Sequence, residues 1–201
     1  MKPLLFLGNL RIVWRSLLAI ACLSLVARPV MLATAQTPPS WYNCRTRERF
    51  TPAKRLWCSR WQTLQTITLV VPTTLDSNAE LTTITLTNGR YQRADGRFFV
   101  ELVNERNWFT FGDLNEDGKQ DAAVIFGVAL DPDGRAVATY LTAVMDIDGA
   151  AQAITPIRLG ERIRLNGPIT IADQQVKVPL LTMTEVIDRA YQLETRLIQV
   201  R

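Results

Sequence analysis

The 201-residue sequence contains no histidine, and serine is scarce outside its N-terminal region. After residue 35 only Ser40, Ser59 and Ser77 remain, and none of them lies in a Gly-x-Ser-x-Gly motif. Serine and cysteine triads use a histidine base. The sequence therefore excludes these triad hydrolases and leaves carboxylate chemistry as the remaining enzymatic route.

A hydrophobic run long enough to span a membrane is also missing near the N-terminus. The run from Ser16 to Ala27 is shorter than the roughly 18 residues that cross a bilayer, and Arg28 closes it. Basic residues precede the run, and the small residues Ala33-Thr34-Ala35 follow it. This order predicts a secretory signal peptide over residues 1–35, cleaved after Ala35, and a periplasmic or secreted mature protein with no stable membrane span.

Net charge is missing from the predicted mature chain. The first 35 residues hold four of the 23 Lys and Arg residues and none of the 19 Asp and Glu residues, so the remainder is formally neutral. Residues 45–60 are locally basic, but no aromatic stacking module accompanies them. We therefore expect no nucleic-acid partner and interpret the basic segment as a solvated helix face.

Cysteine is rare, with three residues in the whole chain. Cys22 lies inside the predicted signal peptide, where a lipoprotein cleavage site is a minor alternative. Cys44 and Cys58 remain, and an even pair in an exported chain predicts a disulfide.

The residues that are present predict a single domain. Residues 36–40 form a polar linker, and one β-rich domain covers 41–201. Thr51 is a suitable N-cap and Pro52 suits the first helical position, so the helical spacing that follows predicts a helix from about Pro52 to Gln65.

Beyond Ile67 the pattern changes to β-branched and aromatic runs separated by Asn-Gly and Asp-Gly turns, which are typical of hairpins. We expect strands near residues 83–87, 97–103, 108–111, 122–130, 136–146, 154–159, 163–165, 169–171, 180–191 and 196–200. The fold class is mainly β, either an antiparallel meander sheet or a partly closed barrel, with the N-terminal helix packed on it. The apolar runs 122–126 and 140–145 indicate central strands covered on both faces.

One segment has the spacing of a metal-binding loop. Oxygen-bearing side chains occupy positions 1, 3, 5 and 9 of the loop that begins at residue 113, with Gly118 at position 6 and the Lys119 carbonyl at position 7. Calcium takes about six to eight oxygen ligands, and a glycine permits the sharp bend that brings them together. The predicted ligands of a structural Ca²⁺ are Asp113, Asn115, Asp117, Lys119 and Asp121. The alternative is a polar hairpin turn that uses Asp-Gly only for its backbone geometry.

Position 12 of this loop is Val124, where an EF-hand has glutamate, so the loop is not an EF-hand. The pattern Gly-Asp-Leu-Asn-Glu-Asp-Gly-Lys-Gln-Asp-Ala-Ala-Val over 112–124 instead resembles the calcium hairpin of the integrin-type FG-GAP family. Only one complete copy occurs, so the resemblance implies a calcium loop and not the propeller fold. Together with Thr-Asn-Gly-Arg-Tyr at 87–91 and Leu-Gly-Glu-Arg-Ile at 159–163, the chain is similar to a group of uncharacterised bacterial exported proteins common in cyanobacteria, which implies export and a β domain but no activity.

Three functional hypotheses follow. The first is a non-catalytic binding or structural module, stabilised by calcium, whose partner is an envelope protein or polymer. The second is a carboxylate-dependent hydrolase of an envelope polymer, for which the sequence does not choose among Asp76, Glu80, Glu101 and Glu105. The third is an inhibitor or assembly factor that docks through the basic, aromatic helix. For the tryptophans near that helix, burial against the sheet is the alternative.

Overall fold

A computed structural model describes residues 41–74, 79–130, 137–181, 186–193 and 197–200. The predicted signal peptide, linker and Cys22 lie outside these residues. Within them the protein is mainly β, with one α-helix and antiparallel strand pairing throughout, as expected. No helix in these ranges is both long enough and apolar enough to cross a membrane.

The helix α1 extends over Pro52–Gln65, which confirms the predicted bounds. Its start is fixed locally, because the Thr51 hydroxyl accepts a hydrogen bond from the Lys54 N–H at 3.2 Å and Pro52 occupies the first turn. The predicted disulfide is present and joins Cys44, in the segment before the helix, to Cys58 within it.

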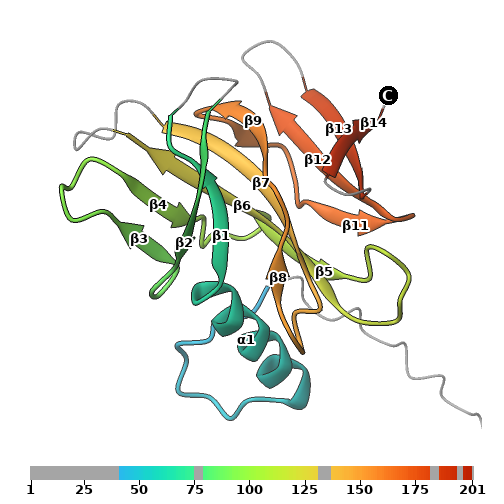
Figure 1. The fold of residues 1–201 in the computed structure, drawn as a ribbon. Helices are drawn as coiled ribbons and strands as arrows, with labels where there is room; N and C mark the ends of the chain where they lie inside the picture. Colours follow the sequence, from blue (N-terminus) through green and yellow to red (C-terminus); the bar gives the residue numbers. More distant parts are fainter. Residues whose placement is uncertain (1–40, 75–78, 131–136, 182–185, 194–196, 201) are drawn as a thin grey trace, which may run out of the picture. The chain divides into compact units, whose positions relative to one another are not determined.

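The largest sheet has seven strands and is curled (Figure 1). Its main path is β3-β4-β6-β7-β8, with β5 also paired to β6 and β9 also paired to β7. The strands are β3 (Arg90–Gln92), β4 (Phe99–Leu102), β5 (Phe109–Gly112), β6 (Asp121–Ala129), β7 (Val137–Met145), β8 (Gln152–Ala153) and β9 (Ile157–Glu161). The apolar runs of the sequence form β6 and β7, the two longest strands at the centre of the sheet.

Two smaller sheets complete the fold. One is the hairpin β1 (Thr68–Pro72) and β2 (Leu81–Thr85). The other has the order β10-β12-β13-β14, with β11 paired to β12. Its strands are β10 (Arg164–Leu165), β11 (Thr170–Ala172), β12 (Gln175–Leu181), β13 (Val186–Leu193) and β14 (Leu197–Val200).

The central strand β6 is covered on both faces, as predicted. Val124 and Phe126 belong to a core that includes residues of α1, β1 and β4. Ala123 and Ile125 belong to a second core, which includes buried residues of β12 and β14. Because successive strand residues point to opposite faces, the uninterrupted apolar run of β6 serves both cores.

Four expectations about the strands are wrong. Strands β1, β3 and β8 were not expected, and the strand predicted over 180–191 is two paired strands, β12 and β13. Proline argues against a strand interior because it cannot donate to the ladder. Here Pro179 lies within β12, opposite Asp188, and its carbonyl accepts a hydrogen bond from the Asn166 N–H at 2.9 Å.

Candidate metal centre

The predicted metal ligands occupy the connection between β5 and β6. The pair Gly112 and Asp121 closes the hairpin, so Asp113 follows β5 directly and Asp121 is the first residue of β6. Gly118 has a φ of 81°, in the left-handed region that glycine adopts without strain. The glycine therefore makes the bend that the sequence pattern predicted.

Asp121 is the buried end of the loop, with no exposed side-chain surface. Its Oδ2 accepts a hydrogen bond from the Leu114 N–H, and its Oδ1 accepts one from the Asp146 N–H, both at 2.9 Å. One carboxylate thus connects the β5–β6 loop to the turn that follows β7. This satisfies two backbone donors in a place where an unpaired donor would be costly.

The exposed part of the loop is organised by side chains that accept backbone hydrogen bonds. The Gly118 N–H donates to Asp113 Oδ2 at 2.9 Å, and the Lys119 N–H donates to Asp117 Oδ1 at 2.8 Å. Asn115 accepts from the Asp117 N–H at 3.2 Å and donates from its amide to Asp117 Oδ2 at 3.1 Å. These short-range bonds fold the alternating oxygen side chains into a compact loop.

One loop oxygen has no partner in the described part of the chain. Asp113 Oδ1 is buried and accepts no hydrogen bond there, although the other oxygen of the same carboxylate is bonded to Gly118. Buried polar atoms in proteins are nearly always paired. Among the loop oxygens, Asp113 Oδ1 is therefore the strongest candidate for binding a cation or another group outside the described residues.

Charge in the loop perturbs two titrating groups. The hydrogen bond from the Lys119 N–H, followed by the one from the Asn115 amide, lowers the pKa of the Asp117 carboxyl. The Lys119 ammonium lies 3.0 Å from Asp146 Oδ2, and this hydrogen bond raises the pKa of Lys119, with further contributions from the charges of Asp117 and Asp121. The Lys119 ammonium is thus held mainly by Asp146 of the turn after β7, with smaller contributions from the loop carboxylates.

The structure brings the five predicted residues into one loop but ties four of their side chains, those of Asp113, Asn115, Asp117 and Asp121, to backbone N–H groups. Among the residues described, no group of three or more His, Cys, Asp or Glu side chains is arranged to hold a metal ion. Calcium binding by Asp113, Asn115, Asp117, Lys119 and Asp121 stays a prediction.

Sequence reasoning missed the residues that anchor this loop to the helix. Arg60 of α1 donates to both carboxylate oxygens of Asp148, at 2.8 and 2.6 Å, and to the Gln120 side chain at 3.1 Å. The Arg60 guanidinium also lies over the Phe111 ring. No local pattern could have found this contact, because Arg60 and Asp148 are 88 positions apart in the sequence.

The aromatic residues near the helix mainly contact each other and the sheet. Trp61 is buried and stacks on Phe109 of β5, with ring centroids 4.5 Å apart. Trp57 packs against Trp41, Tyr42, Phe109 and Phe111. Trp61 is thus buried against the sheet, as the alternative to docking expected, whereas Trp41, Tyr42 and Trp57 are only half-buried.

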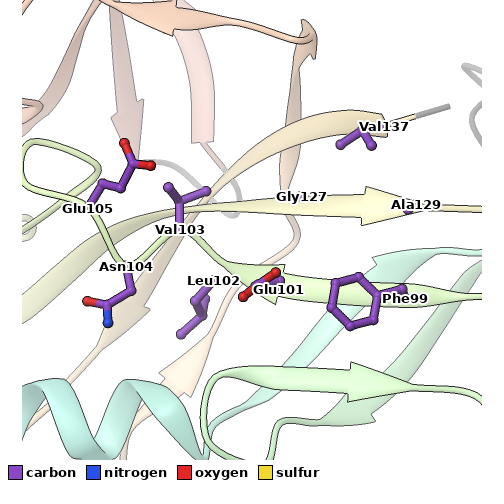
Figure 2. Close-up of a pocket in the computed structure, with 9 residues that line it drawn as sticks. All are labelled: Phe99, Glu101, Leu102, Val103, Asn104, Glu105, Gly127, Ala129 and Val137. Atoms are coloured by element: carbon purple, nitrogen blue, oxygen red, sulfur yellow. The ribbon is translucent and has the colours of Figure 1, made fainter. Parts of the chain in front are cut away.

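Two of the candidate hydrolase carboxylates line one surface hollow of about 510 Å³ beside β4. Figure 2 shows that the Glu101 and Glu105 carboxylates do not point toward each other. Glu101 is bound to Arg90, whose Nε lies 2.7 Å from Glu101 Oε1. Glu80 lies elsewhere, next to the start of β2, and Asp76 is outside the described residues. The hollow therefore gives the hydrolase hypothesis no acid and base pair from Glu101 and Glu105.

Comparison with known proteins finds no matching family model, no matching curated protein and no matching solved structure. By its fold the chain is a mainly β protein with one helix packed on a curled antiparallel sheet.

Proposed function

We propose that the protein is an exported, non-catalytic binding or structural module whose β5–β6 loop holds a structural calcium ion. The observation that carries the calcium assignment is Asp113 Oδ1, a buried carboxylate oxygen without a hydrogen-bond donor in the described residues. A cation bound there would compensate this buried oxygen, which receives no hydrogen bond from the described residues.

The spacing of the loop supports the same assignment. A carboxylate has about four lone-pair sites, so an oxygen that accepts one backbone N–H can also bind a cation. Asp113 and Asp117 each accept one backbone N–H, and Asp121 accepts one on each oxygen. Calcium tolerates irregular coordination, and water completes its shell at exposed positions such as Asp117.

The first experiment is calorimetric titration of Ca²⁺ into the chelator-stripped mature protein, beginning at Gln36. We expect binding, accompanied by a calcium-dependent rise in Tm because a ligand that binds only the folded state stabilises it. Asp117→Ala should abolish or weaken binding by about tenfold or more, equivalent to about 1.4 kcal/mol.

Glu116→Gln is the matched control for this titration. Glu116 is an exposed residue of the same loop at a position that supplies no predicted ligand, and the substitution removes one carboxylate charge. We expect Glu116→Gln to retain most of the calcium affinity. Equal losses of affinity in the two variants would show that calcium is attracted only by the general negative charge of the loop. If millimolar calcium gives no binding heat and no rise in Tm, the loop is an ordinary hairpin turn and the calcium assignment is wrong.

Export is tested separately from calcium. Mass spectrometry of the protein made with its full N-terminus in a bacterial host should find a chain starting at Gln36 in the periplasm or medium, with Cys44 and Cys58 oxidised. A lipid-modified chain starting at Cys22 would establish the lipoprotein alternative, and a full-length cytoplasmic chain would contradict export.

A further inference from the structure

A groove beside the helix has the composition of a ligand site, and none of the loop residues lines it. Two adjoining hollows of about 590 and 540 Å³ share five lining residues, so we treat them as one surface and name it the helix groove. The shared residues are Arg45, Trp61, Gln65, Asn88 and Asn104.

The amides of the groove have free hydrogen-bonding groups. The side chains of Gln65, Asn88 and Asn104 make no hydrogen bond with any residue that the structure describes, and Asn43 uses only its Oδ1, which accepts from the Arg45 N–H at 2.9 Å. An amide both donates and accepts. Several unpaired amides on one concave surface suit a ligand rich in hydroxyl groups, which also donate and accept.

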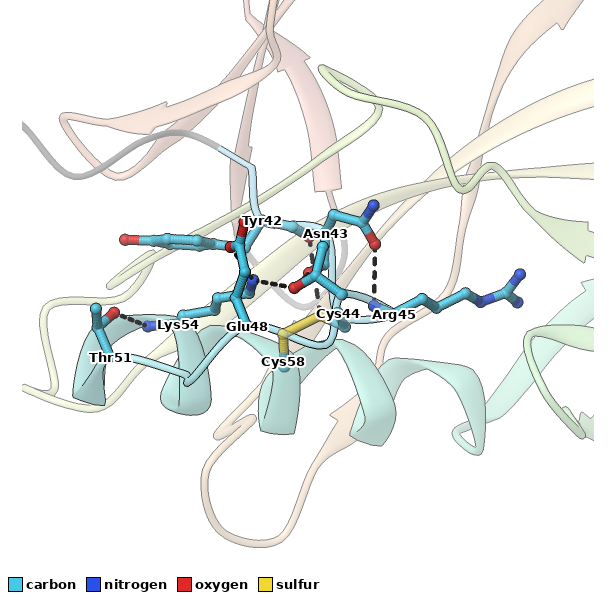
Figure 3. A network of polar contacts seen from close by, with 9 residues as sticks. Tyr42, Asn43, Cys44, Arg45, Glu48, Thr51, Lys54 and Cys58 are labelled. Atoms are coloured by element: carbon cyan, nitrogen blue, oxygen red, sulfur yellow. Dashed lines mark hydrogen bonds and ion pairs between the residues drawn. A yellow bond between two sulfur atoms is a disulfide. The ribbon is translucent and has the colours of Figure 1, made fainter.

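The charge of the groove is positive at one point. Glu101 is the one carboxylate among the residues lining it, and Arg90 pairs with it at 2.7 Å. Arg45 is exposed, and its guanidinium has no partner among the described residues. Figure 3 shows the Arg45 side chain extending away from the disulfide, with only its backbone N–H engaged by Asn43. A free guanidinium on a concave surface suits a carboxylate, which it can bind in a bidentate manner.

The aromatic wall adds apolar surface and one unpaired donor. Trp41, Tyr42 and Trp57 line the groove next to the amides. Trp41 Nε1 is buried and has no acceptor in the described part of the chain, although the indole N–H of a buried tryptophan usually has one. Small-molecule sites combine such an apolar wall with a few polar groups that fix the ligand.

We infer that the helix groove binds an acidic saccharide: Arg45 pairs with a sugar carboxylate, the amides bind hydroxyl groups, and the Trp41, Tyr42 and Trp57 rings contact the apolar face of a sugar ring. This site is separate from the calcium loop and does not rest on it. A binding role of this kind would fit an exported module that contacts a polymer of the cell envelope.

The test uses four probes with the mature protein: an oligogalacturonate, its methyl ester, a neutral galactose oligosaccharide and a triglutamate peptide. We expect the oligogalacturonate to bind, and the methyl ester, which keeps the sugar but loses the charge, to bind about tenfold more weakly. Triglutamate, which keeps the charge but lacks the sugar, should bind more weakly still. Calorimetry or ligand-observed NMR measures these affinities.

Variants locate the site on the protein. Arg45→Gln should lower affinity for the oligogalacturonate about tenfold and remove the preference over its methyl ester. Arg47→Gln is the matched control, because Arg47 is exposed in the same segment but does not line the groove. Asn104→Ala should weaken binding of the acid and the ester alike.

Three results would overturn the inference. The first is that the oligogalacturonate does not bind at about 10 mM. The second is that Arg45→Gln and Arg47→Gln lose the same affinity for it, and the third is that triglutamate binds as tightly as the saccharide. The last two would show that general charge attraction is sufficient. Because Arg45 is exposed and unpartnered, its substitution should leave the thermal unfolding of the protein unchanged, and the same sample verifies this.

Discussion

The β5–β6 loop and the helix groove are both lined by polar side chains, but they use their hydrogen-bonding groups differently. In the loop, Asp113, Asn115, Asp117 and Asp121 accept backbone N–H groups of the loop or of a neighbouring turn. In the groove, the amides and Arg45 leave most of their donors and acceptors without a protein partner.

This difference separates two roles for polar residues. Side chains that pair with backbone groups of the same fold stabilise that fold, and their loss destabilises the protein. Unpaired side chains on a concave surface contribute little to folding but are available to a ligand. Variants of the loop carboxylates should therefore change stability, whereas variants of the unpaired polar side chains in the groove should change binding alone.

The largest effect should come from Asp121→Ala. The substitution leaves the buried N–H group of Leu114 and the part-buried N–H group of Asp146 without acceptors, which should lower the free energy of unfolding by about 3 to 4 kcal/mol. Urea denaturation measures the change. Asp173→Asn is the control, since Asp173 is an exposed turn carboxylate paired with Lys177 and should matter by about 0.5 kcal/mol or less. Asparagine, unlike alanine, tolerates the positive φ of 55° at this position. Similar losses in both variants would remove the distinction between the buried and exposed carboxylates.

The disulfide should have the next largest effect, because it holds the segment that forms one wall of the groove. Replacing Cys44 and Cys58 by serine releases a loop of about 15 residues, which corresponds to about 3 kcal/mol in the loop-entropy description. We expect the double variant to lose saccharide binding while it keeps calcium binding. If both are lost together under native conditions, the loop and the groove are not independent.

The sequence predicted the local features of this fold and missed the nonlocal ones. Thr51 and Pro52 determine the start of α1, and the helical spacing of the residues that follow extends to its end, so both helix bounds were predicted correctly. The uninterrupted apolar run of β6 likewise predicts from the sequence alone that both faces of this strand are buried. The division of the strands into three sheets depends on contacts between distant segments, and Pro179 made β12 difficult to recognise.

The candidate site divides in the same way. The oxygen side chains of the loop are evident from their spacing between Asp113 and Asp121. Asp146 and Arg60 were missed because their contacts with the loop and its neighbouring turn join segments 25 to 88 positions apart. The helix groove was also missed, since its lining residues come from the N-terminal segment, α1 and the region of β3 and β4.

Arg60→Ala should have a moderate effect that measures how strongly the helix is coupled to the loop. The Arg60 side chain is 15% exposed and that of Asp148 is 41% exposed, so solvent weakens their bidentate pair. We expect a loss of about 1 to 2 kcal/mol, including the lost packing on Phe111. A double-mutant cycle with Asp148→Ala isolates the ion pair. A coupling energy near zero would show that the two elements are held together by the aromatic core alone.

The smallest effect concerns the titration of Asp117 at the exposed end of the loop. Hydrogen bonds from the Lys119 N–H and the Asn115 amide lower the pKa of this carboxyl in the folded protein. A lowered folded pKa means that the contribution to stability is present above the unfolded value, about 3.9, and is lost as the pH falls through the folded pKa. Asn115→Ala removes the second of these bonds, so it should move the pKa of Asp117 part of the way back toward that value in an NMR titration. The backbone hydrogen bond from Lys119 makes the larger contribution to the lowered pKa. If the pKa of Asp117 returned completely to the unfolded value in Asn115→Ala, the Asn115 amide and not the Lys119 N–H would be the main cause of the shift, and this account of the loop would be wrong.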